Sequence, residues 1–297
     1  MTVRVDSRAT GFEWERWRRI IVRALLYAAL AVGTYIFIWP LLWLVTSSVK
    51  ASNEIYSFPP SLIPEVWHWN YIPDAMSKFS FMRSFITTMT IVVGVTIGRL
   101  ISCSLTAFAF ARIRVPGRDV LFIVVLATMM LPYHVTLIPQ YLLFKELGWL
   151  NTVNPLIVPS FFGTTAYLVF LLRQFFRTIP FDYDEAAQID GCSLFGIFFR
   201  IVLPLSLPAL GVVMILTFMG EWNDFLAPLI YLNDLDKMTL AVALRSWHVQ
   251  QNQPGGVKHP EAYIMVVATV ITLIPMLVFF VAQRYFIQGV VISGVKG

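Results

Sequence analysis

The sequence predicts an all-α polytopic membrane protein with six transmembrane helices. Three observations lead to this fold class. Hydrophobic residues make up 58% of the 297 residues and charged residues only 13%, whereas soluble proteins carry about 25% charged residues. The mean hydropathy is +0.72. The apolar residues are gathered in six long segments, and a bilayer-spanning helix needs about 20 mostly apolar residues.

The six predicted spans are separated by segments that carry charges, prolines or both. The first span is not a cleavable signal peptide, because its apolar run and the charged tail before it are both too long. Prolines such as Pro40, Pro132 and Pro208 lie in or beside the spans and predict kinks. The spans are expected at residues 20–45, 86–111, 120–144, 156–172, 203–231 and 263–286.

Basic residues orient the chain, because loops rich in Lys and Arg stay on the cytoplasmic side. Clusters such as Arg16, Arg18 and Arg19 before the first span place both termini in the cytoplasm. The domain organisation is then a basic tail at 1–19 and a transmembrane domain at 20–297. Outer loops follow at about 46–85, 145–155 and 232–262. The first outer loop is rich in aromatic residues and prolines, and either an interfacial belt or a docking surface for an external partner explains it.

Ionisable side chains also occur within or near the ends of the apolar runs, where they are costly unless they face a polar interior. Arg99, Glu221 and Asp224 are the clearest cases. Glu221 and Asp224 are three residues apart and would share one helix face. They indicate either a polar pathway or proton relay, or placement near the outer membrane surface, and we favour the second interpretation.

Small residues recur every four positions along the second span, where they let another helix approach closely. The stripe comprises Gly94, Gly98, Ser102 and Thr106. Packing within this chain is the expected use, and a subunit interface is the alternative. The two cysteines, Cys103 in a span and Cys192 in a cytoplasmic loop, are not expected to pair. No metal-ligand spacing and no catalytic set is found.

The cytoplasmic segment 181–204 has the pattern of two short helices joined at Gly191. Asp182 is expected to cap the first helix, with Glu185 three residues later completing a capping box. Gly191 fits a left-handed helix stop. The second helix is expected at 193–200, before Pro204, and the two form an elbow.

The same segment resembles the EAA motif of permease subunits in binding-protein-dependent ABC importers. It reads Glu185-Ala186-Ala187, three residues, Gly191, nine residues, then Ile201, one residue and Leu203-Pro204. Residues 130–144, 221–229, 239–242 and 283–297 are similar to carbohydrate importers of the maltose type. The resemblance covers residues 20–297 and points to the smaller, six-span permease of the usual pair.

The resemblance implies a type I ABC importer permease fold in which the elbow is the coupling helix on the ATPase. The implied partners are a second homologous permease, a dimer of the ABC ATPase, an extracytoplasmic sugar-binding protein and the lipid bilayer of a bacterial or archaeal plasma membrane, with no nucleic acid. The implied ATPase contacts are Glu185, Ala186, Ala187, Asp190, Gly191, Gly294, Val295, Lys296 and Gly297. A release loop for the binding protein is implied at Gln250, Gln251, Asn252, Gln253, Pro254, Gly255 and Gly256.

The chain itself is not expected to hydrolyse ATP or to hold a cofactor or metal. A phosphate-binding loop needs a Gly-Lys dipeptide, and the sequence has none. ATP and Mg²⁺ are therefore expected in the partner ATPase.

Two other classes of membrane protein are alternatives to the permease. An ion-coupled secondary transporter could use Arg99, Glu221 and Asp224, but it predicts an internal repeat, and none is evident. A polytopic membrane enzyme needs catalytic residues gathered at one depth. The four histidines, His68, His134, His248 and His259, are scattered along the chain.

Overall fold

The computed structural model describes the backbone of residues 8–163, 165–251 and 259–294, and side chains within 17–163, 165–251 and 259–283. Over these residues the chain is helical with no strand. It folds as two compact units. The first unit comprises residues 1–75 and 257–269, and the second comprises 76–256 and 270–297.

The first unit is built on α1 (Arg8–Ser47), a helix of 40 residues that continues through Pro40. Its spanning part, Trp17–Ser47, has a mean hydropathy of 2.0, and none of its most apolar window is buried. The apolar side chains of α1 therefore require lipid or another chain around them. The unit also contains α2 (Ser52–Ile55), the start of α3 (Tyr71–Lys78) and the start of α15 (Pro260–Gly294).

An aromatic stack and a buried lysine hold the loop that follows α1. Tyr71 is buried between two histidines, with ring centroids 4.9 Å from His68 and 5.0 Å from His259. The Lys50 side chain is buried and donates a hydrogen bond to the Ser61 carbonyl. These contacts order a loop that has little regular structure of its own.

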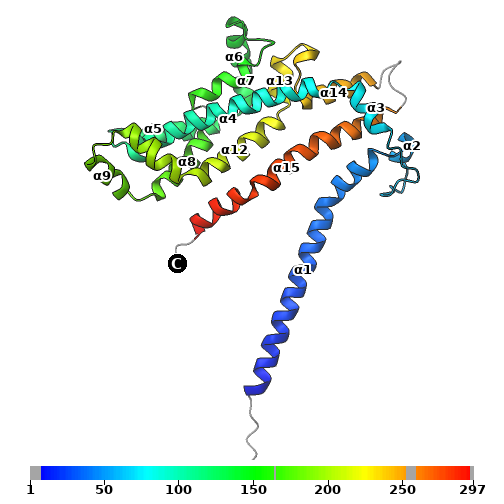
Figure 1. Ribbon diagram of the computed structural model, residues 1–297, viewed down its shortest axis with the longest axis horizontal. Coiled ribbons are helices and arrows are strands. Elements are labelled where there is room, and N and C mark those ends of the chain that lie inside the picture. Colours follow the sequence, from blue (N-terminus) through cyan, green and yellow to red (C-terminus); the bar gives the residue numbers. More distant parts are fainter. Residues whose placement is uncertain (1–7, 164, 252–258, 295–297) are drawn as a thin grey trace, which may run out of the picture. The chain divides into compact units, whose positions relative to one another are not determined.

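The second unit is a helical bundle with an elbow after α8 and several short helices (Figure 1). Three helices, α4, α8 and α12, form its centre. Its elements are α4 (Phe81–Arg112), α5 (Arg118–Ala127), η1 (Thr128–Met130), α6 (Tyr133–Glu146), α7 (Asn154–Ile157), η2 (Val158–Phe162), α8 (Ala166–Thr178), α9 (Asp182–Ile189), α10 (Leu194–Ile197), η3 (Phe198–Val202), α11 (Leu203–Leu205), α12 (Leu207–Trp222), α13 (Leu226–Tyr231), η4 (Leu235–Lys237) and α14 (Leu240–Gln251).

The core of this unit lies where α4, α8 and α12 meet. Cys103, Leu172 and Val213 come from these three helices, and each is fully buried in the same hydrophobic cluster. Phe198 of η3 also joins the cluster and packs on Phe108 with ring centroids 5.2 Å apart. The elbow is therefore continuous with the core. Both cysteines are free, as the sequence predicts.

The small-residue stripe of α4 packs against this chain's own segment 157–163. A Cβ at Gly94 would contact Ile157 at 2.8 Å, and one at Gly98 would overlap Ser160. Ser102 donates a hydrogen bond to the Ser160 carbonyl at 2.7 Å. At the end of the stripe, Thr106 lies beside Gly163. The prediction of internal packing is confirmed.

The six predicted spans correspond to four candidate membrane spans and two sharply bent helix pairs. The expected helix at 120–144 is broken: Arg118–Met130 and Tyr133–Glu146 meet at 95°. Pro132 lies in this break and cannot donate the backbone hydrogen bond that a continuing helix needs. The expected span 203–231 is also interrupted. Its helix α12 begins after a 77° bend and ends at Trp222.

Candidate functional site: the elbow and the ion pairs

The elbow begins with α9 and turns at Gly191. The Gly191 N–H donates to the Gln188 carbonyl at 3.0 Å, and the Cys192 N–H donates to the Ala187 carbonyl at 2.8 Å. This pair of bonds is the Schellman motif, which requires a left-handed residue after the helix. Gly191 has φ +77°. The predicted helix stop at Gly191 is confirmed.

The start of α9 differs from the prediction. The helix begins at Asp182, Phe181 occupies the cap position, and no side chain accepts a hydrogen bond there. The predicted capping box between Asp182 and Glu185 is therefore wrong. The first turn instead carries Asp182, Asp184 and Glu185, whose negative charges favour the positive end of the helix dipole. The second helix, α10, does have a side-chain cap, because the Gly196 N–H donates a hydrogen bond to Ser193 Oγ at 3.2 Å.

One face of α9 is exposed and the other is anchored. Glu185, Ala186 and Asp190 are exposed, whereas Ala187 is half-buried against the core. Ile189, an apolar residue that the sequence analysis did not single out, is 87% exposed. A charged side chain, a small one and an exposed apolar one thus lie on a surface that the described residues leave uncovered.

The anchor of the elbow is an ion pair between Asp184 of α9 and Arg112, the last residue of α4. Arg112 Nε lies 3.4 Å from Asp184 Oδ2, and the two side chains are 1% and 8% exposed. Arg112 also donates to the Ile179 carbonyl at 2.8 Å and lies over the Phe181 ring, 4.4 Å from its centroid. Burial raises the pKa of Asp184, and the charge of Arg112 opposes that rise.

Sequence reasoning missed this anchor. Asp184 directly precedes the motif, and Arg112 belongs to the basic cluster that follows the second predicted span. The available signal was that both charges adjoin apolar runs, where an unpaired charge is costly.

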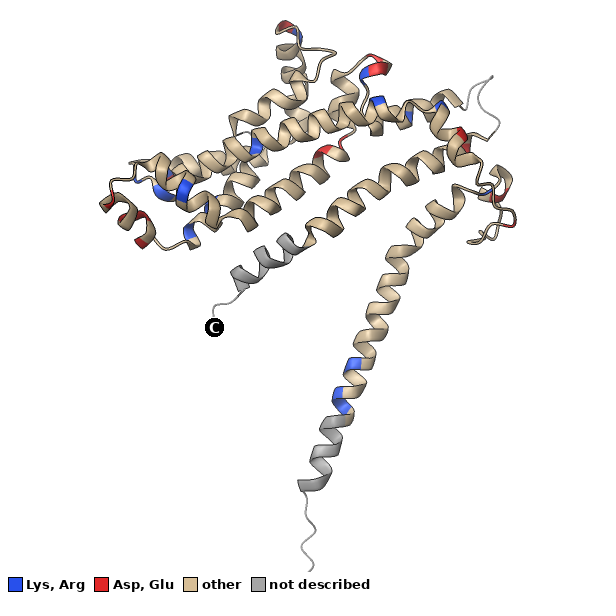
Figure 2. Ribbon diagram, in the orientation of Figure 1, with Lys and Arg blue, Asp and Glu red and all other residues tan. Residues whose placement is uncertain are grey.

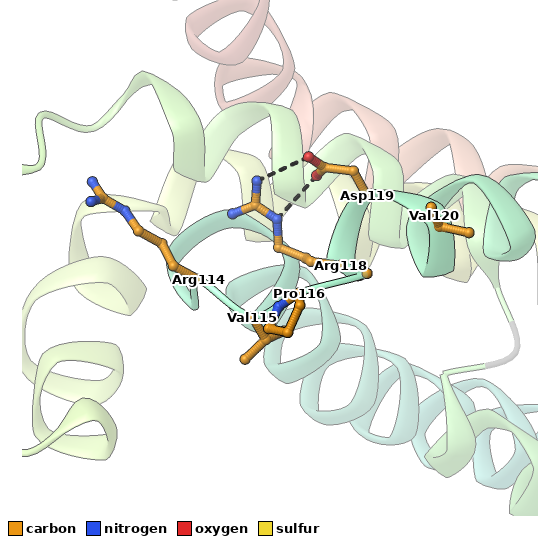
Figure 3. A pocket seen from close by; sticks show the side chains of 7 residues that line it. Arg114, Val115, Pro116, Arg118, Asp119 and Val120 are labelled. Atoms are coloured by element: carbon orange, nitrogen blue, oxygen red, sulfur yellow. Dashed lines mark hydrogen bonds and ion pairs between the residues drawn. The ribbon is translucent and has the colours of Figure 1, made fainter.

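The loop between α4 and α5 forms a second charged cluster beside the elbow. Arg118 makes a bidentate contact with Asp119, with Nε–Oδ1 at 3.0 Å (Figure 3). Arg173 of α8 also approaches Asp119 at 3.4 Å and lies over the Phe122 ring at 4.0 Å. Figure 3 shows Arg114 extending away from this pair. These contacts tie α5 to α8 at the end of the bundle.

A third ion pair lies inside the bundle, and sequence reasoning did identify its members. Arg99 Nη2 is 2.8 Å from Glu221 Oε1, with side chains 22% and 13% exposed. Arg99 is about 20 Å from Arg112 and about 27 Å from Phe81 along α4, at about 1.5 Å per residue. In Figure 2 a basic segment interrupts the uncharged ribbon of α4 partway along its length, and an acidic segment lies at the end of α12. A place near the middle of α4 argues against the interfacial interpretation.

The sequence predicted that Glu221 and Asp224 share a helix face. This prediction is wrong, because α12 ends at Trp222 and Asp224 lies beyond it. Asp224 lies in the break before α13, where its Oδ1 accepts a hydrogen bond from the Ala227 N–H at 3.4 Å.

Asn151, in the segment between α6 and α7, joins two loops and has a left-handed conformation, with φ +61°. Its N–H donates to the Tyr231 carbonyl at 2.8 Å, and its Nδ2 donates to Asp234 Oδ2 at 2.6 Å. Lys237 donates to the Asn151 carbonyl at 3.0 Å. The hydrogen bonds from Asn151 and Lys237 lower the pKa of Asp234.

The two remaining implied sites are only partly described. Gln250 and Gln251 end α14, and Asn252, Gln253, Pro254, Gly255 and Gly256 lie outside the described residues. Gly294 ends α15, and Val295, Lys296 and Gly297 also lie outside them. Among the described residues, no group of three or more His, Cys, Asp or Glu side chains is placed to hold a metal ion.

An apolar helical bundle with broken spans, a buried ion pair and an exposed charged elbow defines an integral membrane transport subunit. The chain belongs to the family of binding-protein-dependent transport system inner membrane components, whose model matches residues 94–292. The family predicted from the EAA motif is thus confirmed. The chain is a permease subunit and is not the subunit that hydrolyses ATP.

Curated relatives cover nearly the whole chain. The diacetylchitobiose uptake system permease protein NgcG of Streptomyces coelicolor is 31% identical over 91% of this chain and 88% of its own length. The arabinooligosaccharides transport system permease protein AraQ of Halalkalibacterium halodurans is 31% identical over 93% and 98%. The sn-glycerol-3-phosphate transport system permease protein UgpE of Agrobacterium fabrum is 30% identical over 92% and 97%.

Solved structures share the fold. A chain of a bacterial ABC transporter involved in the import of the acidic polysaccharide alginate superimposes with a TM-score of 0.78, at 22% identity, over 96% of this chain and 100% of that chain. A chain of the bacterial alginate ABC transporter in complex with alginate pentasaccharide-bound periplasmic protein gives a TM-score of 0.61, at 16% identity, over 90% and 96%. The predicted permease fold is confirmed.

Proposed function

We propose that this chain is the permease of a carbohydrate importer and that the exposed face of α9 is its contact with an ABC ATPase. The observation that carries the coupling role is the contrast within one short helix. Asp184 is buried against Arg112, whereas Glu185 and Ala186 point away from the fold and are exposed. The named substrates of two relatives, diacetylchitobiose and arabinooligosaccharides, support the carbohydrate class.

The chemistry of this face suits docking to a basic cleft. A carboxylate at Glu185 can pair with an arginine in bidentate geometry. The small side chain of Ala186 lets a partner backbone approach closely, and Ile189 offers apolar area that is 87% exposed before docking. The Schellman turn at Gly191 fixes the angle at which this face is presented.

The remaining partners and the orientation belong to the same proposal. A second permease, a dimer of the ATPase and a sugar-binding protein complete the importer, with both termini of this chain in the cytoplasm. ATP and Mg²⁺ are held by the ATPase. Residues 250–256 reach the binding protein from the outer side, and residues 294–297 add a second contact with the ATPase.

The first test is affinity purification of the chain from its host in mild detergent, followed by mass spectrometry and by reconstitution into liposomes. We expect a second permease, an ABC ATPase and a binding protein to co-purify, and uptake to require ATP. Transport by the chain alone, driven by an ion gradient without ATP, would instead establish the secondary transporter.

The coupling role is tested by Glu185→Lys in the reconstituted complex. Charge reversal on the exposed face should leave the protein folded and reduce ATP-driven uptake at least tenfold, whereas Glu185→Gln should have a smaller effect. Glu146→Lys is the matched control, because it makes the same charge change at an exposed position at the end of α6. Equal uptake by the Glu185→Lys and Glu146→Lys complexes would rule out Glu185 as a coupling contact.

A further inference from the structure

Two helix breaks in the second unit carry polar side chains inside an otherwise apolar bundle. The first break is at residues 131–132, between η1 and α6, and Tyr133 follows it. The second is at residues 223–225, between α12 and α13, and contains Asn223 and Asp224. Backbone that leaves the helical path at membrane depth is tolerated only when protein buries it or when it lines a water-filled cavity.

The two breaks adjoin each other. The hydroxyl of Tyr133 lies beside that of Tyr231, the last residue of α13, and within electrostatic range of the Asp224 carboxylate. Tyr231 in turn stacks on Tyr141 of α6, with ring centroids 6.4 Å apart. Residues far apart in the sequence thus bring four polar groups together near the ends of α6, α12 and α13.

The Arg99–Glu221 ion pair lies in the same region of the bundle. Glu221 is two residues before Asn223 and three before Asp224, so the pair lies within one turn of the second break. In the described part of the chain, Arg99 Nε has no hydrogen-bond partner. The residues that the structure describes therefore leave one donor of the Arg99 guanidinium unused.

This polar segment is not closed off by the chain's own side chains. Asn223 is exposed, and its Nδ2 is bonded only to its own helix, at the Met219 carbonyl, 2.7 Å away. Tyr133 and Phe225 are 39% and 37% exposed. Because exposed amides and carboxylates are costly against lipid tails, these groups must face water or protein.

We propose that Asn223, Asp224 and Tyr133, together with the Arg99–Glu221 pair, line the water-filled part of the translocation path in this chain. This inference rests on the proposed function. The segment offers an amide, carboxylates and a guanidinium, which donate to and accept from hydroxyl groups in both directions, beside the exposed rings of Tyr133 and Phe225. A neutral, hydroxyl-rich solute is the chemical class that such a lining suits.

The test is thiol labelling of the complete reconstituted transporter. The variant Asn223→Cys is built with Cys103→Ala and Cys192→Ser. If Cys103→Ala fails to assemble, Cys103 is retained, because it is fully buried. The probe is the cationic methanethiosulfonate reagent with a trimethylammonium group. The matched control is Ile97→Cys, which lies two residues from Arg99 on α4 and is 47% exposed among apolar side chains.

Methanethiosulfonates react with the thiolate, and a thiol in apolar surroundings stays protonated. We expect Asn223→Cys to react at least tenfold faster than Ile97→Cys. Because Glu221 and Asp224 outnumber Arg99, the cationic reagent should outpace the anionic sulfonate analogue by several-fold, and Asp224→Asn should reduce that preference. The rate should change when ATP and vanadate trap the ATPase.

The outcomes separate the inference from the function on which it rests. Labelling of Asn223→Cys at the slow rate of Ile97→Cys, in a complex that still couples ATP to uptake, would overturn the path assignment and leave the permease role intact. A complex that neither assembles with an ATPase nor takes up solute with ATP would contradict the proposed function instead.

Discussion

The turn at Gly191 allows a quantitative test of how the elbow is held. A Cβ added at Gly191 would meet no atom within 4 Å, so Gly191→Ala creates no clash, and its whole cost is the left-handed backbone at φ +77°. That cost is about 1–2 kcal/mol for a residue with a Cβ. It should appear as a more frequent opening of the last turn of α9.

Hydrogen exchange measures that opening directly, because the Gly191 and Cys192 amides are bonded to the Gln188 and Ala187 carbonyls. If exchange follows local opening, a cost of 1–2 kcal/mol accelerates it about 5- to 30-fold. In Gly191→Ala this acceleration is expected at the amide of Cys192, whereas Gly191→Asn should be milder because Asn tolerates the left-handed region. The measurement is hydrogen–deuterium exchange with mass spectrometry on the detergent-solubilised protein.

Gly117→Ala is the matched control. Gly117 also has a positive φ, +82°, and an added Cβ there meets nothing within 4 Å. It should pay the same backbone cost at the start of α5 and leave exchange in α9 unchanged. Unaltered exchange at the Cys192 amide in Gly191→Ala would refute the assignment of a Schellman turn that requires glycine at this position. Equal acceleration of exchange in α9 by the Gly191→Ala and Gly117→Ala variants would refute it as well.

Three further outcomes are expected. Asp184→Asn removes one partner of the buried Arg112–Asp184 pair and should lower the free energy of unfolding by about 3–5 kcal/mol. The double variant Asp184→Asn with Arg112→Met should recover part of that loss, as measured by thermal unfolding. Additive losses from the two substitutions would contradict a direct pair. Gly98→Val should overpack α4 against Ser160 and Phe161 and destabilise the folded protein by about 1–3 kcal/mol. Gly33→Val is the control, because an added side chain at Gly33 meets open space. Equal melting temperatures for the two variants would disprove the close approach at Gly98. The pKa of Asp234 is depressed in the folded chain. The contacts of Asp234 with Asn151 and Lys237 should therefore stabilise these loops fully above the ordinary aspartate pKa of about 3.9 and be lost as the pH falls through the depressed pKa. Proteolysis of these loops that already rises near pH 5 would argue against those contacts.

Fold class and family could be predicted from the sequence because both depend on local patterns. Apolar runs of membrane-spanning length identify the spans, and the spacing from Glu185 to Pro204 identifies the elbow. The stop at Gly191 was predictable for the same reason, since only the adjoining helix and the glycine decide it. The stripe from Gly94 to Thr106 also indicated close packing correctly.

What the sequence did not reveal depends on tertiary partners. A kink at Pro132 was predicted, but its 95° sharpness was not, because the segments on both sides of Pro132 are apolar enough to be read as one span. Asp182 was expected to cap α9, but the helix begins one residue earlier than a capping box requires. The pairing of Asp184 with Arg112 joins residues 72 positions apart, and no short-range pattern encodes that contact.

The two ion pairs that α4 makes have a joint mechanical consequence. Arg99 pairs with Glu221 in the bundle, and Arg112 pairs with Asp184 at the elbow. Both arginines belong to one uninterrupted helix of 32 residues, and close-packed helices move as rigid bodies rather than deforming. On the coupling role proposed above, helix α4 would transmit a displacement of α9 over about 20 Å to Arg99 and Glu221 beside the break in α12, because no hinge interrupts α4 between Arg112 and Arg99.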